Sequence, residues 1–296
     1  MNILIAGGTG FLGTALVDNL TADGCKVFIL TRRKPGTSKQ IRWDGLTTSG
    51  WSQIVNEVDA VVNITGLSTA HWPWTKKRKQ QFVDSRVLPG RALASAIGNA
   101  VRRPKVFLQV SGINHYGLRG DSIADETTPP ADDFLAQLTV QWEESTRPLE
   151  ELGIRRVVMR SAVVLHRRGG LFPLMALPTR LYFGGRFGSG MQAFPWIHIE
   201  DYVRAVHFLL ENENARGPFN LIAPEPASNA EFMREVCNAL SRPYWFHIPE
   251  ALLRMTLGEM SNLLVDGRFA RPKRLLESGF TFKYGKLSDA LKSLLA

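Results

Sequence analysis

The sequence contains few of the residues that build metal centres and disulfide frameworks. Only two of its 296 residues are cysteines, Cys25 and Cys237, and they stand far apart in the chain. Isolated cysteines provide neither a disulfide framework nor the paired spacing of a zinc site. The six histidines are scattered, with no HExxH or similar cluster. We therefore predict that the protein holds no metal ion.

Long hydrophobic runs are also absent. No apolar stretch approaches the roughly 20 residues of a membrane-spanning helix, and the apolar chain start lacks the basic segment of a signal peptide. Hydrophobic residues still make up 44% of the chain, which is enough for one large core or for a main domain with a smaller second one. We expect a cytoplasmic protein without a membrane partner.

Acidic residues are too few to balance the basic ones. Lysine and arginine number 36 against 27 for aspartate and glutamate, so the formal net charge is +9. Such an excess suggests nucleic acid or an anionic small molecule as a partner. The basic residues are dispersed in short runs, however, such as 76–79, and no nucleic-acid module or aromatic platform accompanies them. We expect a small-molecule substrate rather than nucleic acid, and the sequence indicates no oligomeric state.

A glycine turn is present at the chain start. Residues 2–5 read as a short buried strand, residues 11–20 place apolar side chains at helical intervals, and the segment AGGTGFLG joins them. Glycines at such a turn let backbone N–H groups approach a pyrophosphate, to which the helix N-terminus adds partial positive charge. The alternative is that the glycines serve only close packing, but the βαβ order favours dinucleotide binding. We predict cofactor contacts at Gly7, Thr9, Gly10, Phe11, Leu12 and Gly13.

The residues after the second expected strand, 26–30, bear on the choice of cofactor. Folds selective for NAD usually have an acidic residue here, roughly 20 residues beyond the glycines, that binds the ribose 2′-hydroxyl. This chain has Thr31, Arg32 and Arg33 instead. An arginine pairs with the oxygens of a 2′-phosphate, which a carboxylate would repel. We predict that Arg32 selects NADP(H), whereas Arg33 and Lys34 fit a solvated loop equally well.

Strand-like and helix-like segments alternate through the first half of the chain. Further strands are expected at residues 40–43, 59–64, 106–110 and 156–160, with helices at 75–99 and 134–149. The alternation predicts an α/β fold with a doubly wound, parallel, Rossmann-type sheet. Because proline lacks an N–H group, we expect the first of these helices to kink near Pro89.

The pattern changes beyond Gly169. A strand at 217–222 and a helix at 229–240 are expected there, separated by irregular segments. We predict an NADP-binding Rossmann domain over residues 1–165, to which later segments can return. Residues 166–296 are expected to form a smaller, substrate-facing domain.

Several stretches resemble a known family. The glycine turn, TRR, NITG, VSGINHYG and WIHIEDY resemble extended short-chain dehydrogenases/reductases of the nucleotide-sugar epimerase and dehydratase type. The stretches DFLAQLTVQWEE, GSGMQAFPWIHIED and RPKRLLESGF are similar to the "epimerase family" proteins, an atypical branch with a small extra C-terminal domain. The resemblance covers essentially the whole chain and implies an NADP-binding Rossmann domain.

The resemblance also implies particular cofactor contacts. They fall on Thr31, Arg32, Ile64, Thr65, Gln81, Arg86 and Val164, and Gly66 completes the NITG turn. Arg86 would reach a phosphate or ribose, although a surface salt bridge explains it equally well. Asp44 would accept a hydrogen bond from the adenine amino group, or it caps its own loop.

The catalytic pair typical of short-chain dehydrogenases is missing. In that pair a lysine follows a tyrosine by four residues and lowers the tyrosine pKa, but none of the five tyrosines here has such a lysine. The remaining polar candidates are Ser111, at the end of the fifth strand, and His115 and Tyr116 just beyond. They would exchange protons with a substrate oxygen. For Tyr116, simple packing in the loop is the favoured alternative.

Two functions from different classes are consistent with these features. The first is an NADP(H)-dependent oxidoreductase, or a nucleotide-sugar epimerase-like enzyme, with its proton donor among residues 111–116. The second is a noncatalytic NADP(H)-binding redox sensor or regulatory protein, which the missing pair favours.

The motif WIHIED is assigned a structural role, with Asp201 as a helix cap, and Gln192 is expected to face substrate. Arg271 and Lys273 either hold an anionic substrate or keep the tail solvated.

Overall fold

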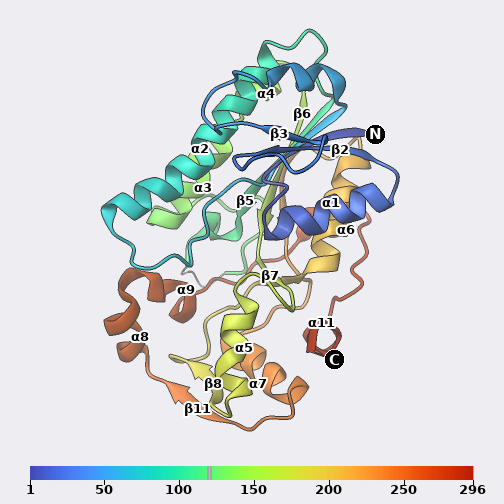
Figure 1. The fold of residues 1–296 in the computed structure, drawn as a ribbon. Helices are drawn as coiled ribbons and strands as arrows, with labels where there is room; N and C mark the ends of the chain where they lie inside the picture. The colour runs from blue at the N-terminus through green and yellow to red at the C-terminus, as the bar shows by residue number, and fades with distance from the viewer. Residues whose placement is uncertain (119, 121, 296) are drawn as a thin grey trace.

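The computed structural model describes residues 1–118, 120 and 122–295, and its centre is one parallel sheet (Figure 1). Seven strands pair in the spatial order β10-β6-β5-β4-β1-β2-β3. The chain order reverses between β1 and β4, which confirms the predicted doubly wound, Rossmann-type sheet. The strands are β1 (Asn2–Ala6), β2 (Lys26–Thr31), β3 (Gln40–Arg42), β4 (Ala60–Asn63), β5 (Val106–Gly112), β6 (Arg155–Ser161) and β10 (Gly217–Leu221).

Helices cover both faces of this sheet. One face packs against α1 (Phe11–Ala22) and α6 (Ile199–Glu211), and the other against α2 (Lys76–Gly98), α3 (Phe134–Glu144), α4 (Pro148–Glu151) and the 3₁₀ helix η1 (Ser52–Glu57) (Figure 1). Strand β1 sends Ile3 and Ile5 to the first core and Leu4 to the second, and all three are fully buried. Burial on both sides explains why these strands are continuous apolar runs.

A smaller unit with its own core adjoins the carboxyl edge of the sheet. Its apolar core is contributed mainly by α5 (Phe172–Arg180), α7 (Asn229–Ala239) and α11 (Leu287–Leu295). Two short parallel pairs join β7 (Val163–Leu165) to β9 (Trp196–His198) and β8 (Gly184–Phe187) to β11 (Tyr244–Ile248). The remaining elements are η2 (Ile113–Tyr116), α8 (Glu250–Leu257), η3 (Gly258–Ser261), α9 (Asn262–Val265) and α10 (Lys273–Glu277).

Two expected elements differ from the observed ones, whereas the helix expected at 75–99 is found as α2. The strand expected in the smaller domain at 217–222 is β10, which instead pairs with β6 at the edge of the large sheet. The helix expected at 134–149 ends at Glu144, and a separate short helix begins at Pro148, where proline suits a first turn. The helix α2 continues past Pro89 to Gly98 as one element.

The motif WIHIED fastens the C-terminal segment to α6. His198, rather than Asp201, caps this helix, because its Nδ1 atom accepts the Glu200 N–H at 3.1 Å. The carboxylate of Asp201 is fully buried and accepts the backbone N–H groups of Lys283 and Tyr284, both at 2.8 Å. The expected cap at Asp201 is therefore wrong, and its structural role lies in holding the tail.

Replacing Asp201 with alanine is expected to lower the free energy of unfolding by about 3 kcal/mol, because two backbone N–H groups lose their buried, charged acceptor. Urea denaturation followed by circular dichroism measures the change. Asp18→Ala, on the exposed face of α1, is the matched control and should change the unfolding free energy by less than about 0.5 kcal/mol. Equal effects of the two substitutions would contradict this role.

Candidate functional site

A cleft of about 910 Å³ opens at the carboxyl edge of the sheet, where the strand order reverses. Its size lies within the range of about 300–1,000 Å³ found for small-molecule sites. The structure brings ten of the predicted cofactor residues to its wall. They are Gly7, Thr9, Gly10, Thr31, Arg32, Asp44, Ile64, Thr65, Gly66 and Gln81.

The glycines of the turn have two different roles. Gly7 has a φ of +91°, and a Cβ there would lie 2.9 Å from the Ile64 carbonyl oxygen. A Cβ on Gly13 would overlap the Gly7 carbonyl group, so Gly13 serves close packing and does not line the cleft. At Gly10, by contrast, the nearest atom to a Cβ would be the Gly7 carbonyl oxygen at 3.3 Å, and Gly10 borders the cleft. Close packing therefore explains why positions 7 and 13 are glycine, but it explains less well why position 10 is glycine.

The start of α1 fits an anionic group. Gly10 is its N-cap, no side chain caps the helix, and no acidic residue stands in its first turn. The first N–H groups of a helix have no partner within it and carry partial positive charge. A pyrophosphate in the cleft would bind these N–H groups, so the start of α1 supplies the pyrophosphate site that a dinucleotide requires.

Buried polar contacts fix the loop that follows β4. The side chain of Asn63 is fully buried, and its Nδ2 atom donates to Gln109 Oε1 at 3.0 Å on the neighbouring strand. Its Oδ1 atom accepts the Thr65 hydroxyl at 2.7 Å. The hydroxyl of Ser85 on α2 accepts the Leu67 N–H at 3.0 Å. These bonds hold the NITG turn as one wall of the cleft.

The end of β2 presents an exposed arginine to the cleft. Thr31 is buried, and its hydroxyl accepts the Arg33 N–H at 3.2 Å. The side chain of Arg32 is exposed and forms no ion pair with any residue that the structure describes. This position suits recognition of a phosphate by a guanidinium group.

Asp44 serves its own loop. Its carboxylate accepts the N–H groups of Leu46 and Thr47, each at 2.8 Å, and the Thr47 hydroxyl at 2.7 Å. These hydrogen bonds lower the pKa of Asp44 to about 2. The capping alternative is therefore correct, although Asp44 also borders the cleft.

Arg86 lies behind the cleft wall rather than on it. The guanidinium group stacks over the Trp142 ring at 4.8 Å and donates to the Phe82 carbonyl oxygen at 3.1 Å. Burial lowers its pKa to about 10. No carboxylate pairs with it within the described chain, so the alternative of a surface salt bridge is wrong. A Cβ on Gly66 would lie 3.2 Å from Arg86 Cζ, which places the charge directly behind the NITG turn.

Three more of the predicted cofactor contacts do not border the cleft, namely Phe11, Leu12 and Val164. The Phe11 ring packs against His166, with ring centroids 5.3 Å apart, and Leu12 and Val164 belong to the core beneath the sheet.

Other cleft residues were missed in the sequence. They are Leu30, Trp43, Gly45, Leu46, Leu67, Arg78, Asp84, Ser85, Leu88 and Pro89, and Arg33, for which a solvated loop fits the sequence equally well, also borders the cleft. One signal was available: Arg78, Gln81, Ser85 and Leu88 follow at intervals of three and four, so they share one face of α2. Arg78 lies in the basic run that was interpreted as a solvated surface.

The predicted catalytic residues gather around a buried ion pair. Arg160 on β6 binds both carboxylate oxygens of Glu143 on α3, each at 2.9 Å. The Ser111 hydroxyl donates to Glu143 at 2.7 Å. The Tyr116 hydroxyl accepts from Arg160 at 3.0 Å and donates to Asn220 at 2.7 Å. The structure thus brings the three predicted residues into one network, but none of them borders the described cleft.

The protonation states of this network follow from its contacts. Burial alone would raise the pKa of Glu143, but its bonds to Arg160 outweigh burial and hold the pKa below its usual value. Burial lowers the pKa of His115 to about 4, an effect that Glu143 opposes and Arg160 reinforces. Burial raises the pKa of Tyr116. At neutral pH the network therefore holds one carboxylate, one guanidinium group, a neutral imidazole and a protonated phenol.

The tautomer of His115 can be inferred from its neighbour. The Thr139 hydroxyl donates to the Ala136 carbonyl oxygen at 2.7 Å, so it can only accept from His115 Nδ1 at 3.3 Å. Nδ1 therefore carries the proton, and Nε2 offers a lone pair. His115 could accept a proton through Nε2, whereas the Ser111 hydroxyl would have to turn from Glu143 to donate to a ligand.

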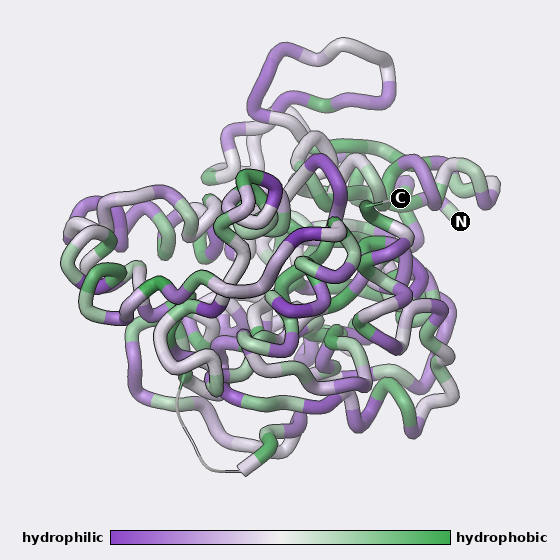
Figure 2. The backbone as a smooth tube through the Cα atoms, turned by 90° about the horizontal axis from the view of Figure 1, so that it is seen from below, coloured by the Kyte–Doolittle hydropathy of each residue, from purple (hydrophilic) through white to green (hydrophobic). Residues whose placement is uncertain are grey.

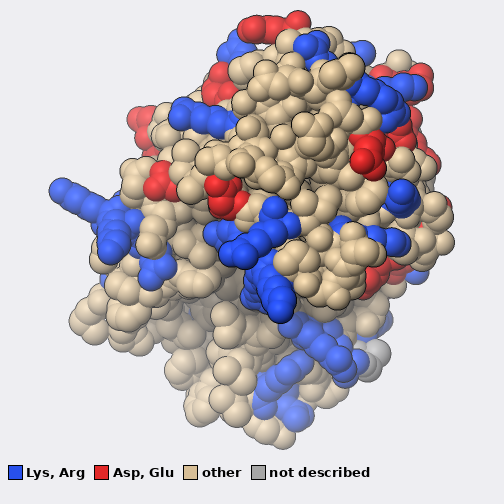
Figure 3. All heavy atoms as spheres, turned by 45° about the horizontal axis from the view of Figure 1, so that its top comes forward, with Lys and Arg blue, Asp and Glu red and all other residues tan. Residues whose placement is uncertain are grey.

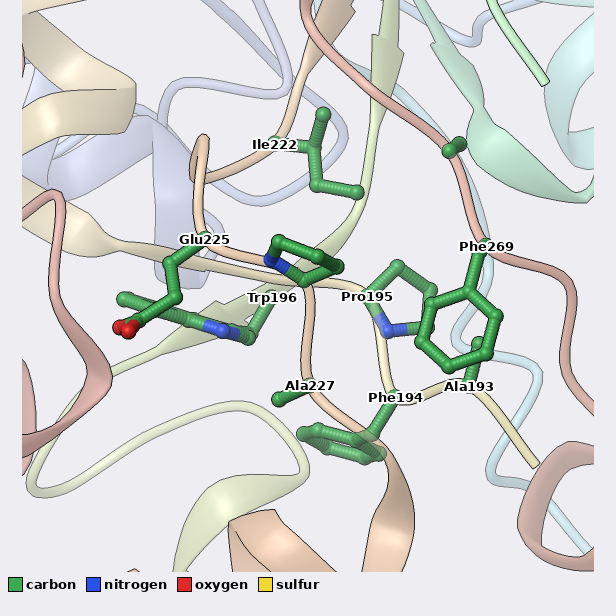
Figure 4. Close-up of a pocket in the computed structure, with 10 residues that line it drawn as sticks. Ala193, Phe194, Pro195, Trp196, Ile222, Glu225, Ala227 and Phe269 are labelled. Atoms are coloured by element: carbon green, nitrogen blue, oxygen red, sulfur yellow. The ribbon is translucent and has the colours of Figure 1, made fainter. Parts of the chain in front are cut away.

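Beyond the cleft lie a small cavity and the remaining candidates for substrate binding. A second cavity, between Trp196, Ile222 and Phe269, has a volume of about 10 Å³, comparable to one water molecule (Figure 4). The Gln192 amide donates to the Phe187 and Leu264 carbonyl oxygens at 2.9 and 2.7 Å, and its expected role toward substrate stays a prediction. The tail cations Arg271 and Lys273 both approach Asp125, at 3.1 and 3.7 Å.

The stability of the protein should depend on the protonation of His115. Its pKa is about 4 in the folded chain against 6.5 as the ordinary value, so the unfolded chain binds more protons between these values. The free energy of unfolding should then fall as the pH drops from about 6.5 to about 4. Urea titrations across this range should show a shallower fall for His115→Gln than for the unchanged chain. Parallel pH profiles would contradict the assignment.

Comparisons with known proteins agree with this architecture. Residues 3–142 match the model of the NAD dependent epimerase/dehydratase family, and residues 248–294 match a domain of unknown function, DUF1731. No helix in the described ranges is long and apolar enough to cross a membrane. The same ranges contain no group of three or more potential metal-binding side chains.

Similar proteins align over the full chain. The chain is 36% identical to the epimerase family protein YfhF of Bacillus subtilis, over 100% of this chain and 98% of the relative. It is 38% identical to the epimerase family protein SDR39U1 of Bos taurus, over 100% of both. The crystal structure of human SDR39U1 with NADPH superposes with a TM-score of 0.93 at 36% identity, covering 100% of this chain and 99% of that one. The chain therefore belongs to the epimerase family proteins, in which an epimerase/dehydratase region precedes a DUF1731 region.

Proposed function

We propose that this protein binds NADP(H) in the cleft and acts in the cytoplasm as an oxidoreductase or epimerase-like enzyme on an anionic small molecule. The observation that carries the cofactor assignment is the placement of Arg32 on the cleft wall, at the end of β2, where an NAD-selective site has a carboxylate. The uncapped start of α1 and the bordering Gly10 fit the pyrophosphate. The solved human relative with NADPH supports the same assignment.

Different residues would bind the cofactor, attract negative charge and exchange protons with the substrate. Gly10 and the start of α1 orient the pyrophosphate, and Arg32 binds the 2′-phosphate. Arg86, a buried cation behind Gly66, attracts negative charge toward the carboxyl ends of β4 and β5. The bound nicotinamide would supply hydride transfer. Ser111 and His115, held at the end of β5 by Glu143, are the proposed groups for proton exchange with the substrate oxygen.

A specific observation favours the second candidate, a noncatalytic NADP(H)-binding sensor. The helix α3, which should carry the tyrosine and lysine, instead presents Leu135 and Leu138, and both are buried in the core. The Ser111 hydroxyl is also engaged by a carboxylate. A protein of this kind would bind the cofactor tightly and turn over no substrate.

Cofactor preference should reverse in Arg32→Asp. Loss of a charged pair and gain of repulsion should weaken NADPH binding by roughly 100-fold, about 2.7 kcal/mol, with NADH binding changed much less. Isothermal titration with both cofactors measures the two affinities. Lys34→Asp makes the same change of charge two residues away and does not border the cleft, so it should retain the preference for NADPH. A chain indifferent to the cofactor and to Arg32→Asp would refute the assignment.

Turnover should distinguish the enzyme from the sensor. Across a panel of carbonyl compounds and nucleotide sugars, an oxidoreductase would oxidise NADPH in a substrate-dependent manner. An epimerase-like enzyme returns the hydride to its substrate, so its turnover is measured by chromatography as conversion of the sugar. The Ser111→Ala, His115→Ala double variant should lower that rate by at least about 100-fold, given the usual contribution of general acid–base groups. NADPH affinity is the control and should be unchanged. Tight cofactor binding without turnover of any compound would favour the sensor.

A further inference from the structure

The far end of the smaller unit carries an exposed cluster of aromatic side chains, here called the aromatic tip. It consists of Tyr182, Phe183, Trp245 and Phe246, from the segment before β8 and from β11. The Phe183 ring lies 5.6 Å from the Phe246 ring, and the Trp245 Nε1 atom donates to the Tyr182 carbonyl oxygen at 2.9 Å. Trp245 is nevertheless 62% exposed and Tyr182 56%. The rings pack against one another but remain exposed to solvent.

An aliphatic stripe on α5 continues this surface. Leu174, Leu177 and Leu181 follow at intervals of three and four, and each is about half exposed or more, while Met175 points into the core. Leu181 directly precedes Tyr182 in the chain. Figure 2 views the molecule from this end and shows hydrophobic (green) stretches among the hydrophilic ones facing the viewer. A contiguous apolar surface of this kind marks an interaction site.

The segment that contributes Tyr182 and Phe183 to the aromatic tip carries arginines and no acidic residue. The chain has no aspartate or glutamate from residue 152 to residue 199. Arg180 and Arg186 in this stretch are exposed, and the Arg242 guanidinium lies 4.3 Å from the Tyr182 ring centroid. The lower end of the face seen in Figure 3 likewise shows blue side chains and no red ones. Beyond the stretch, Glu250 at the start of α8 is paired with Arg254 at 2.7 Å.

A second copy of the chain is a poor partner for this surface. A two-fold dimer would place the patch against itself and bring the same arginines face to face. Strand addition at the open edge of β11 is also hindered, because the pairing register of β11 shifts between Tyr244 and Phe246. Pro243 and Pro249 flank the strand. A bulge and flanking prolines are features by which edge strands resist further pairing.

We propose that the aromatic tip docks on an anionic lipid surface. Tryptophan and tyrosine rings rest at the headgroup level of a membrane, leucine side chains enter the acyl boundary, and arginines bind lipid phosphates. The apolar rings, the leucine stripe and three arginines, none of which forms an ion pair with a described carboxylate, supply these three elements at one end of the molecule. None of the residues of the aromatic tip borders the cofactor cleft, so docking leaves that cleft open.

Flotation of the full chain with vesicles tests this surface. The protein should float with vesicles of equal parts phosphatidylcholine and phosphatidylglycerol, remain behind with phosphatidylcholine alone, and dissociate as salt is raised. Phe183→Ser, Trp245→Ser should weaken binding by about tenfold or more, since two large apolar groups are lost. Trp72→Ser removes a tryptophan that is 56% exposed on the loop before α2 and should leave binding unchanged.

A fluorescence measurement and a second double variant test the proposal further. Tryptophan emission should shift to the blue on anionic vesicles, the shift should disappear in Trp245→Phe, and Trp72→Phe should retain it. If the serine double variant melts early, Arg180→Gln, Arg186→Gln replaces it and should weaken anionic binding in the same way. Absence of binding, equal binding to both vesicle types, or a dimer on size exclusion that the aromatic substitutions dissociate would overturn the proposal.

Discussion

The close approach of the glycine turn to the loop after β4 determines the geometry of the cleft. At Gly7 the backbone of β1 passes so near the Ile64 carbonyl group that a side chain would not fit, and its left-handed conformation is one that glycine adopts without strain. Gly13 then brings α1 against the same turn. With both contacts in place, the N-terminus of α1 and the NITG loop border a single opening at the switch point of the sheet.

The predictable parts of the cleft are those formed by residues that lie close together in the chain. The glycine turn, the basic residues after β2 and the NITG loop each depend on a few consecutive residues, and their strands end at one edge because the sheet is parallel. The place of β10 could not be predicted in this way, because its pairing with β6 joins residues about 60 positions apart. The end of α3 was missed although the sequence marks it, because Ser145 and Thr146 are weak helix formers and Pro148 disfavours a helical residue before it.

The catalytic candidates show a different limit of sequence reasoning. Ser111 and His115 were identified by their place after a strand, but the groups that control them are Glu143 and Arg160, from α3 and β6. A carboxylate and an arginine separated by 17 residues give no signal until tertiary packing buries them together. Once buried, the pair is strongly constrained, because removing either partner would leave the other charge without compensation. Burial lowers the pKa of His115 beside this pair, Glu143 opposes the shift and Arg160 reinforces it, so the histidine stays neutral.

The positive charge of the chain has more than one physical consequence. Arg86 is desolvated behind a backbone turn, where a charge acts at short range and is weakly screened by salt. The arginines near the aromatic tip are in contact with solvent, where salt weakens their attraction to an anion and individual pairs contribute little. The arginines near the aromatic tip therefore need a ligand that carries many charges, such as a charged lipid surface, whereas the exposed Arg32 borders a cleft in which a single phosphate would be held by other groups as well. The formal charge of +9 alone does not distinguish these cases, because the burial of each cation and its place inside or outside the cleft decide which kind of ligand it can hold.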